Sequence, residues 1–156
     1  RLLPVNKIVE TFYCETPFDR WLTVRIKEGI FSLDFSNSRQ GRKVAGEIKD
    51  FLFSFFSSHG RNLPPWEILN TEAYSPLQIK LYEEVRKIKA GEILSYRELA
   101  EKLCCHPRVI GKMLSLNRHA LFIPCHRIIR KNGTPGGYRW GKRLKEEIIT
   151  WESLHW

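Results

Sequence analysis

The sequence predicts an α+β fold in two parts, a mixed N-terminal part and a helical C-terminal part. Polar and apolar residues alternate through residues 21–35, which is the period of half-buried strands. Further along, Ser75 and Ser95 each stand at the start of an amphipathic stretch in the pattern of a helix N-cap. The 156 residues are enough for one ordinary domain or two small ones.

The boundary between the two parts is predicted near residue 70. Pro64-Pro65 follows a helical pattern, and no periodic pattern resumes before Tyr74, so residues 60–74 are interpreted as a linker. We therefore expect a supporting α+β domain over residues 1–70 and a second, mainly helical domain over residues 75–156.

The N-terminal part is expected to contain strands and one helix. Residues 5–14 and 21–35 alternate as strands do, and Glu28-Gly29 is placed to turn the second run into a hairpin. Residues 42–58 then carry apolar side chains at helical spacing. Nothing in this part indicates chemistry.

The C-terminal part opens with three predicted helices. Ser75 with Gln78 and Ser95 with Glu98 form capping boxes, and Pro107 is suited to the first position of a third helix. The helices that begin at Ser95 and Pro107 are short and joined by a tight turn, and the second is basic. This arrangement is typical of a helix-turn-helix. A fifth helical pattern begins near Lys142.

The stretch Leu121–Ile129 is the most unusual in the chain. Its apolar and β-branched residues predict a buried strand, which Pro124 interrupts immediately before Cys125, His126 and Arg127. A positive neighbour favours the thiolate, the nucleophilic form of cysteine. On Cys125 alone a small buried hydrophobic residue is the simpler interpretation.

The charge distribution favours a polyanionic partner. The net charge is +9, and no acidic residue occurs between Glu101 and Glu146. Such a basic stretch is typical of nucleic-acid binding. The basic side chains within it are those of Lys102, Arg108, Lys112, Arg118, Arg127, Arg130, Lys131, Arg139, Lys142, Arg143 and Lys145.

Composition excludes several other classes. No apolar run is long enough for a transmembrane helix, and the start of the chain has no signal-peptide pattern, so we expect no membrane contact and a cytoplasmic location, or a nuclear one in a eukaryote. Cys14 and His59 are too few for structural zinc, and the consecutive residues 104–106 are poorly spaced for tetrahedral chelation. We expect no metal and no cofactor.

The C-terminal motifs together resemble the O6-alkylguanine-DNA alkyltransferase family, the methylated-DNA–protein-cysteine methyltransferases. The resemblance covers residues 75–152, and eight positions separate Asn117 from Cys125 as in that family. The motifs that carry it, in family order, are Ser95-Tyr96, Arg108–Gly111, Asn117, Pro124–Arg127, Gly137-Tyr138 with Gly141, and Lys145 with Glu152.

The resemblance implies an N-terminal ribonuclease-H-like domain and a set of roles. Cys125 would accept the alkyl group, with His126 as base through a bridging water and Glu152 orienting the histidine. Periodicity alone leaves Glu147 and Glu152 as alternatives for that orienting role. Tyr96 would help to flip the nucleotide and would protonate the leaving guanine. Asn117 would join the recognition helix to the reactive segment.

The family also implies a mode of DNA binding. Its helix-turn-helix enters the minor groove, and Arg108 would fill the space left by the flipped base. We expect the residues that bind double-stranded DNA to include Arg108, Ser95, Tyr96, Gly111, Lys112 and Arg127. The expected substrate pocket consists of Pro124, Tyr138, Arg139 and Trp140, of which Trp140 and Arg139 replace residues that are commonly small in the family.

The sequence therefore predicts a monomeric, single-turnover enzyme that repairs O6-alkylguanine. Three alternatives compete with it: a lesion sensor that binds without repair, a helix-turn-helix regulator, and a thiol hydrolase. Lesion sensors of this kind lack the cysteine, so Cys125 argues against the first. The sequence has no oxyanion-hole motif for the third.

Overall fold

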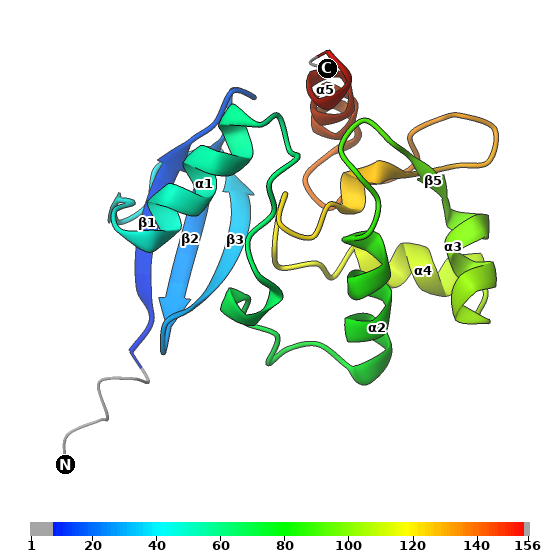
Figure 1. Ribbon diagram of the computed structural model, residues 1–156, viewed down its shortest axis with the longest axis horizontal. Coiled ribbons are helices and arrows are strands. Elements are labelled where there is room, and N and C mark those ends of the chain that lie inside the picture. Colours follow the sequence, from blue (N-terminus) through cyan, green and yellow to red (C-terminus); the bar gives the residue numbers. More distant parts are fainter. Residues whose placement is uncertain (1–7, 155–156) are drawn as a thin grey trace.

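The computed structural model describes residues 8–154, in which a sheet and one helix form the N-terminal half and helices dominate the C-terminal half (Figure 1). One continuous hydrophobic core runs through both halves. The division into two domains at about residue 70 stays a prediction. The mixed α+β class is confirmed.

The N-terminal half is built on a four-stranded sheet in the order β3-β2-β1-β4. Antiparallel pairing joins β1 to β2 and β2 to β3, whereas β4 lies parallel to β1. Glu28 and Gly29 both have positive φ, at 54° and 80°, which confirms the predicted hairpin turn. The strands are β1 (Glu10–Glu15), β2 (Trp21–Lys27), β3 (Ile30–Ser36) and β4 (Arg42–Lys43).

Helix α1 (Glu47–Ser57) covers one face of this sheet (Figure 1). It buries Ile48, Leu52 and Phe55, whose spacing is that of a single helical face. The helix starts later than predicted because residues 42–43 pair with β1 as β4. The first three residues of the predicted strand 5–14 lie outside the described part of the chain.

The linker is more ordered than the sequence indicates. It contains a short 3-10 helix, η2 (Trp66–Ile68), and Leu69 forms an isolated parallel bridge with Phe31 of β3. The amide of Asn70 donates to the carbonyl of Phe31 at 2.8 Å. The linker therefore extends the edge of the N-terminal sheet.

The predicted capping boxes are confirmed at both serines. Ser75 accepts from the amide of Gln78, and Ser95 accepts from the amide of Glu98, with the reciprocal side-chain bond present in each. These caps start α2 (Pro76–Val85) and α3 (Tyr96–Leu103), and Pro107 opens α4 (Pro107–Leu114). Helix α5 (Lys142–Ser153) closes the chain.

The predicted strand through Leu121–Ile129 is wrong at its centre. Cys125–Arg127 form a 3-10 helix, η3, and only β6 (Ile128–Ile129) is extended, pairing in parallel with β5 (Leu94–Ser95). The residues before Cys125 run beside β3, where the amide of Leu33 donates to the carbonyl of Arg118 at 2.9 Å (Figure 1). Burial by tertiary contacts, rather than strand pairing, explains the apolar run.

Candidate active site

The thiol of Cys125 opens η3 and is 3% exposed. Its Sγ accepts a hydrogen bond from Asn117 Nδ2 at 3.1 Å, and the same amide donates to the carbonyl of Ile123 at 3.0 Å. Burial raises the pKa of Cys125 to about 11, against the Asn117 hydrogen bond and the positive charge of Lys145. The basic neighbours expected to favour a thiolate are therefore outweighed, and the thiol needs a base.

Glu152 is the charged centre behind the thiol. Its Oε2 lies 3.0 Å from His126 Nε2. This distance is short enough for an ion pair, but the angle is not that of a hydrogen bond. Burial raises the pKa of the Glu152 carboxyl, but the neighbouring His126 and Arg127 outweigh burial and bring it to about 2. Burial also lowers the pKa of His126, so at neutral pH the ring is neutral and Arg127 is the lasting charge partner of Glu152.

Arg127 is enclosed rather than available to DNA, so its predicted DNA contact is wrong. It is 1% exposed, and its Nε and Nη2 donate to the two carboxylate oxygens of Glu152 at 3.0 and 2.6 Å. The remaining donors reach the carbonyls of Ile88 at 2.7 Å and Gly60 at 2.9 Å. Arg127 therefore connects α5, the end of α2 and the end of α1.

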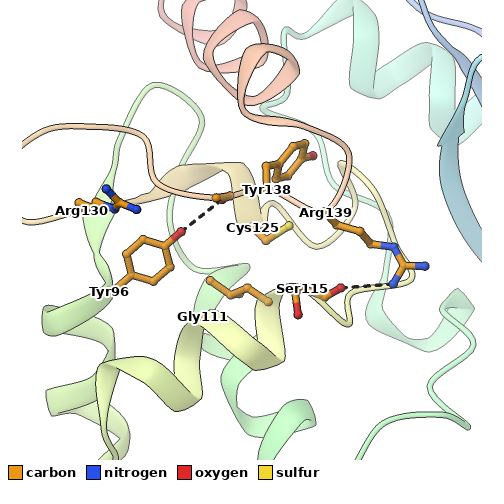
Figure 2. A pocket seen from close by; sticks show the side chains of 9 residues that line it. Tyr96, Gly111, Ser115, Cys125, Arg130, Tyr138 and Arg139 are labelled. Atoms are coloured by element: carbon orange, nitrogen blue, oxygen red, sulfur yellow. Dashed lines mark hydrogen bonds between the residues drawn. The ribbon is translucent and has the colours of Figure 1, made fainter.

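A cavity of about 320 Å³ lies in front of Cys125 (Figure 2). Figure 2 shows Cys125 at its centre, with Gly111 of α4 and Ser115 at the end of that helix on one side and Tyr138 on the other. A Cβ built at Gly111 meets no atom within 4 Å, so the glycine leaves open space there. The lining residues are Tyr96, Gly111, Leu114, Ser115, Cys125, Arg130, Gly137, Tyr138 and Arg139.

Lys145 fixes the loop that closes this cavity. Its Nζ donates to Tyr96 Oη at 3.2 Å and to the carbonyls of Pro135 and Gly137 at 2.6 and 3.1 Å. Burial lowers the pKa of Lys145 to about 8. A Cβ at Gly136 would stand 2.9 Å from Tyr96 Oη, so a glycine permits this close approach.

The helix-turn-helix presents its second helix beside the cavity. Cys104 takes the left-handed conformation at the turn, with φ of 53°, and His106 caps α4 by accepting from the amide of Arg108 at 3.0 Å. Arg108 and Lys112 are exposed on α4, together with Val109, whereas Gly111 faces the cavity. The positively charged face expected for DNA is therefore adjacent to the reactive thiol.

Three further site predictions differ from the structure. The Ser95 hydroxyl is used by the α3 cap and the residue is 7% exposed, so Ser95 positions Tyr96 rather than offering a DNA contact. Pro124 is buried outside the cavity lining, as the residue before η3. Trp140 also lies outside the lining, because its ring packs edge-on against Phe35 and Tyr138.

Arg139 lies where the sequence placed it, whereas the contacts of Lys145 and Gly60 could not be chosen from the sequence. Arg139 does line the cavity, where its Nη1 donates to the carbonyl of Ser115 at 3.3 Å and its Nε lies 3.5 Å from Asp34 of β3. Lys145 belongs to a motif of the family, but its hydrogen bonds to Tyr96 and to the carbonyls of Pro135 and Gly137 arise only in the folded chain. Gly60 lies in the predicted linker and carries no sequence signal for the contact of its carbonyl with Arg127.

Comparison with known families and relatives agrees with this geometry. The family described as "6-O-methylguanine DNA methyltransferase, DNA binding domain" matches residues 76–154. A methylated-DNA–protein-cysteine methyltransferase of Metallosphaera sedula is 42% identical over 142 residues, covering 88% of each chain. One of the same description from Candida albicans is 46% identical over 80 residues, covering 51% of this chain and 46% of that one.

Solved structures share the overall fold. The O6-methylguanine methyltransferase of Mycobacterium tuberculosis has a TM-score of 0.74 at 20% identity, covering 94% of this chain and 93% of that one. The archaeal O6-methylguanine-DNA methyltransferase of Pyrococcus kodakaraensis has a TM-score of 0.74 at 19% identity, covering 94% of this chain and 100% of that one.

Proposed function

This chain belongs to the methylated-DNA–protein-cysteine methyltransferase family, and we propose that it repairs O6-alkylguanine in duplex DNA by moving the alkyl group to Cys125. The observation that carries the proposal is a single one: the buried Cys125 thiol lines a cavity beside an exposed basic recognition helix. A regulator would have no use for such a thiol, and a lesion sensor would not need one.

The transfer is a displacement at the alkyl carbon. The Sγ–C bond forms, the C–O6 bond breaks, and its electron pair leaves with the guanine. The thiol proton passes toward His126, whose Nδ1 has no hydrogen-bond partner among residues 8–154. A bridging water suits this step, because His126 follows Cys125 directly in the chain.

The departing guanine needs a proton, and Tyr96 is placed to give it. Its hydroxyl lines the cavity and is held between Lys145 Nζ at 3.2 Å and the carbonyl of Gly137 at 3.3 Å. Because Lys145 remains cationic near neutral pH, it supports the negative charge that develops on the phenol oxygen. The proton held by His126 then returns through water to the Tyr96 phenolate, so that overall the thiol proton is exchanged for the alkyl group.

Asn117 has two functions in this account. It stabilises negative charge on Sγ through the Nδ2 hydrogen bond, and it joins the end of α4 to the reactive segment. A DNA-induced shift of α4 would therefore reach the thiol directly.

DNA must deliver the lesion outside the base stack. The alkyl group is inaccessible within a duplex, and extrusion costs a few kcal/mol. We propose that α4 enters the minor groove, that Arg108 fills the space left in the stack, and that Lys112 contacts phosphate. Tyr138 and Arg139, which line the cavity, would contact the flipped base.

Each chain would act once. The product is a thioether, and no described residue is placed to regenerate the thiol. We also propose that the protein works as a monomer without a cofactor, in the compartment that holds the DNA, which is the cytoplasm or, in a eukaryote, the nucleus. No helix within residues 8–154 is long and apolar enough to cross a membrane.

The test is incubation with a duplex that carries a single O6-methylguanine, followed by peptide mass spectrometry. We expect one added methyl group on the peptide that contains Cys125, and none with unmodified duplex. Cys125→Ser should bind the same duplex without taking up a methyl group, because a hydroxyl is far less nucleophilic at neutral pH. A methyl group on another residue, or on none, would contradict the proposal.

A further inference from the structure

A chain of buried polar groups runs from the N-terminal sheet to the reactive thiol. His119 and Asn117 are both 0% exposed, and Tyr74 of the linker is 8% exposed. His119 Nε2 lies 2.7 Å from the carbonyl of Phe31, and His119 Nδ1 lies 2.5 Å from Tyr74 Oη. None of these contacts is needed for the alkyl-transfer chemistry itself.

The tautomer of His119 follows from its partners. The carbonyl of Phe31 can only accept, so Nε2 carries the proton. Burial lowers the pKa of His119 to about 4, which keeps the ring neutral at pH 7. Nδ1 is then an acceptor, and the hydroxyl of Tyr74 donates to it. The single proton of Tyr74 is therefore committed to His119 and not to Asn117 Oδ1, 3.4 Å away.

These two side chains hold the backbone of Arg118 and His119, and that backbone determines how the Asn117 amide is turned. Tyr74 Oη accepts from the amide of Arg118 at 2.8 Å, and the backbone amide of His119 donates to Asn117 Oδ1 at 2.9 Å. With Oδ1 engaged there, Nδ2 faces Cys125 Sγ and the carbonyl of Ile123. The opposite orientation would place an amide oxygen against that carbonyl and would lose both donated bonds.

We propose that Tyr74 and His119 are positioning residues that aim the Asn117 amide at the Cys125 thiol. Through them the linker and the edge of the N-terminal sheet set the reactivity of a thiol in the other half of the chain. The consequence for repair rests on the proposed function, but the consequence for the thiol does not.

A purely structural role for Tyr74 gives a different expectation. In that case removal of its hydroxyl would lower the stability and leave the reactivity of folded Cys125 unchanged. Tyr82 supplies the matched control, because it is fully buried and its ring lies 4.7 Å from that of Tyr74. Its hydroxyl donates to the carbonyl of Met113, which is outside the chain of contacts to Asn117.

The experiment compares Tyr74→Phe with Tyr82→Phe. The rate at which iodoacetamide modifies Cys125 is followed from pH 6 to pH 10 by peptide mass spectrometry, which separates Cys125 from the other cysteines. We expect Tyr74→Phe to slow modification about tenfold at neutral pH, at the low end of what one hydrogen bond to a charged group contributes, and to move the pH profile upward. Tyr82→Phe should stay within twofold of the unchanged protein.

A double-variant comparison identifies the route. Asn117→Ala removes the donor, so Tyr74→Phe should have no added effect on modification in that background. Equal rates for Tyr74→Phe and Tyr82→Phe, or an undiminished effect of Tyr74→Phe in Asn117→Ala, would overturn the proposal. If Asn117→Ala does not fold, the two tyrosine variants alone decide. If the unchanged protein does not accept a methyl group from DNA, the proposed repair function is wrong, but the modification rates of Cys125 still test the positioning role of Tyr74 and His119.

Discussion

The two halves of the chain bury different kinds of side chain. Among the described residues, Thr23 is the only buried polar residue before the linker, whereas the C-terminal half buries Asn117, His119, His126, Arg127, Lys145 and Glu152 among others. Burying a polar or charged group costs free energy unless it is paired. The N-terminal half therefore resembles an ordinary apolar support, and the C-terminal half maintains costly groups for chemistry.

The contrast depends on a few contacts that join the halves. The carbonyl of Gly60, at the end of α1, accepts from Arg127, and the carbonyl of Phe31 accepts from His119. In each of these contacts, a backbone carbonyl of the N-terminal half accepts a hydrogen bond from a buried side chain of the C-terminal half. The N-terminal half thus supplies hydrogen-bond acceptors to buried polar side chains of the C-terminal half.

The largest expected effect comes from removing one carboxylate in each half. Glu152→Ala leaves Arg127 buried without its anion, so we expect about 3–5 kcal/mol lower free energy of unfolding. Asp34→Ala removes a carboxylate whose side chain is 24% exposed and lies 3.5 Å from both Arg25 and Arg139, and it should cost less than about 1 kcal/mol. Chemical denaturation of both variants measures the difference, and similar costs would remove the distinction between the halves.

Acid should weaken the protein through the C-terminal half. The pKa of His119 is about 4 when folded and near 6.5 when unfolded, so the unfolded chain binds more protons between these values. Stability should fall by roughly 3 kcal/mol as the pH drops from 6.5 to 4, and protonation of Glu152, with its folded pKa of about 2, adds further loss below about pH 4.5. Unfolding curves across this range measure the slope.

His119→Gln is the control for the acid effect. Glutamine does not titrate, so the slope between pH 6.5 and 4 should become shallower, with His126 supplying the remainder because its pKa is also lowered by burial. An unchanged slope in this variant would show that His119 is not a source of the acid sensitivity.

Two glycines with similar backbone angles provide the next comparison. Gly60 and Gly29 have φ of 86° and 80°, but a Cβ at Gly60 would lie 2.3 Å from Glu152 Oε2, whereas one at Gly29 meets nothing within 4 Å. Alanine at either position strains the backbone. Gly60→Ala should cost about 1–3 kcal/mol more than Gly29→Ala because it also displaces the Arg127–Glu152 pair. Equal melting temperatures would contradict this.

The smallest expected effect concerns DNA alone. Arg108→Ala should slow repair of O6-methylguanine in duplex DNA about tenfold, because no side chain would then fill the space that the extruded base leaves in the stack. Reaction with free O6-benzylguanine should be nearly unchanged. Arg25→Ala removes the same charge from the N-terminal sheet and should alter neither rate. Equal slowing of duplex and free-base reactions by Arg108→Ala would exclude the intercalating role.

Local signals in the sequence predicted the helices well. The capping boxes at Ser75 and Ser95 were confirmed because both partners lie within one helical turn. The hairpin at Glu28-Gly29 was confirmed for a similar reason, since its two turn residues determine the backbone path.

Contacts between distant residues set the limit of prediction. Arg127 looked like a DNA contact because its partner Glu152 is 25 positions away and Gly60 is 67 positions away. The 3-10 turn at Cys125 was taken for a strand because an apolar run indicates burial without specifying the backbone conformation. Trp140 was assigned to the pocket, yet its contact with Phe35 of the N-terminal sheet holds it away.

The most direct test of the account is a count of methyl groups transferred. The protein is incubated with a tenfold excess of duplex containing isotopically labelled O6-methylguanine, and labelled methyl groups per chain are measured together with their position. We predict that uptake stops at one methyl group per chain, on Cys125. Continued turnover, or label on any other residue, would contradict the claim that the C-terminal half holds one buried thiol for a single transfer.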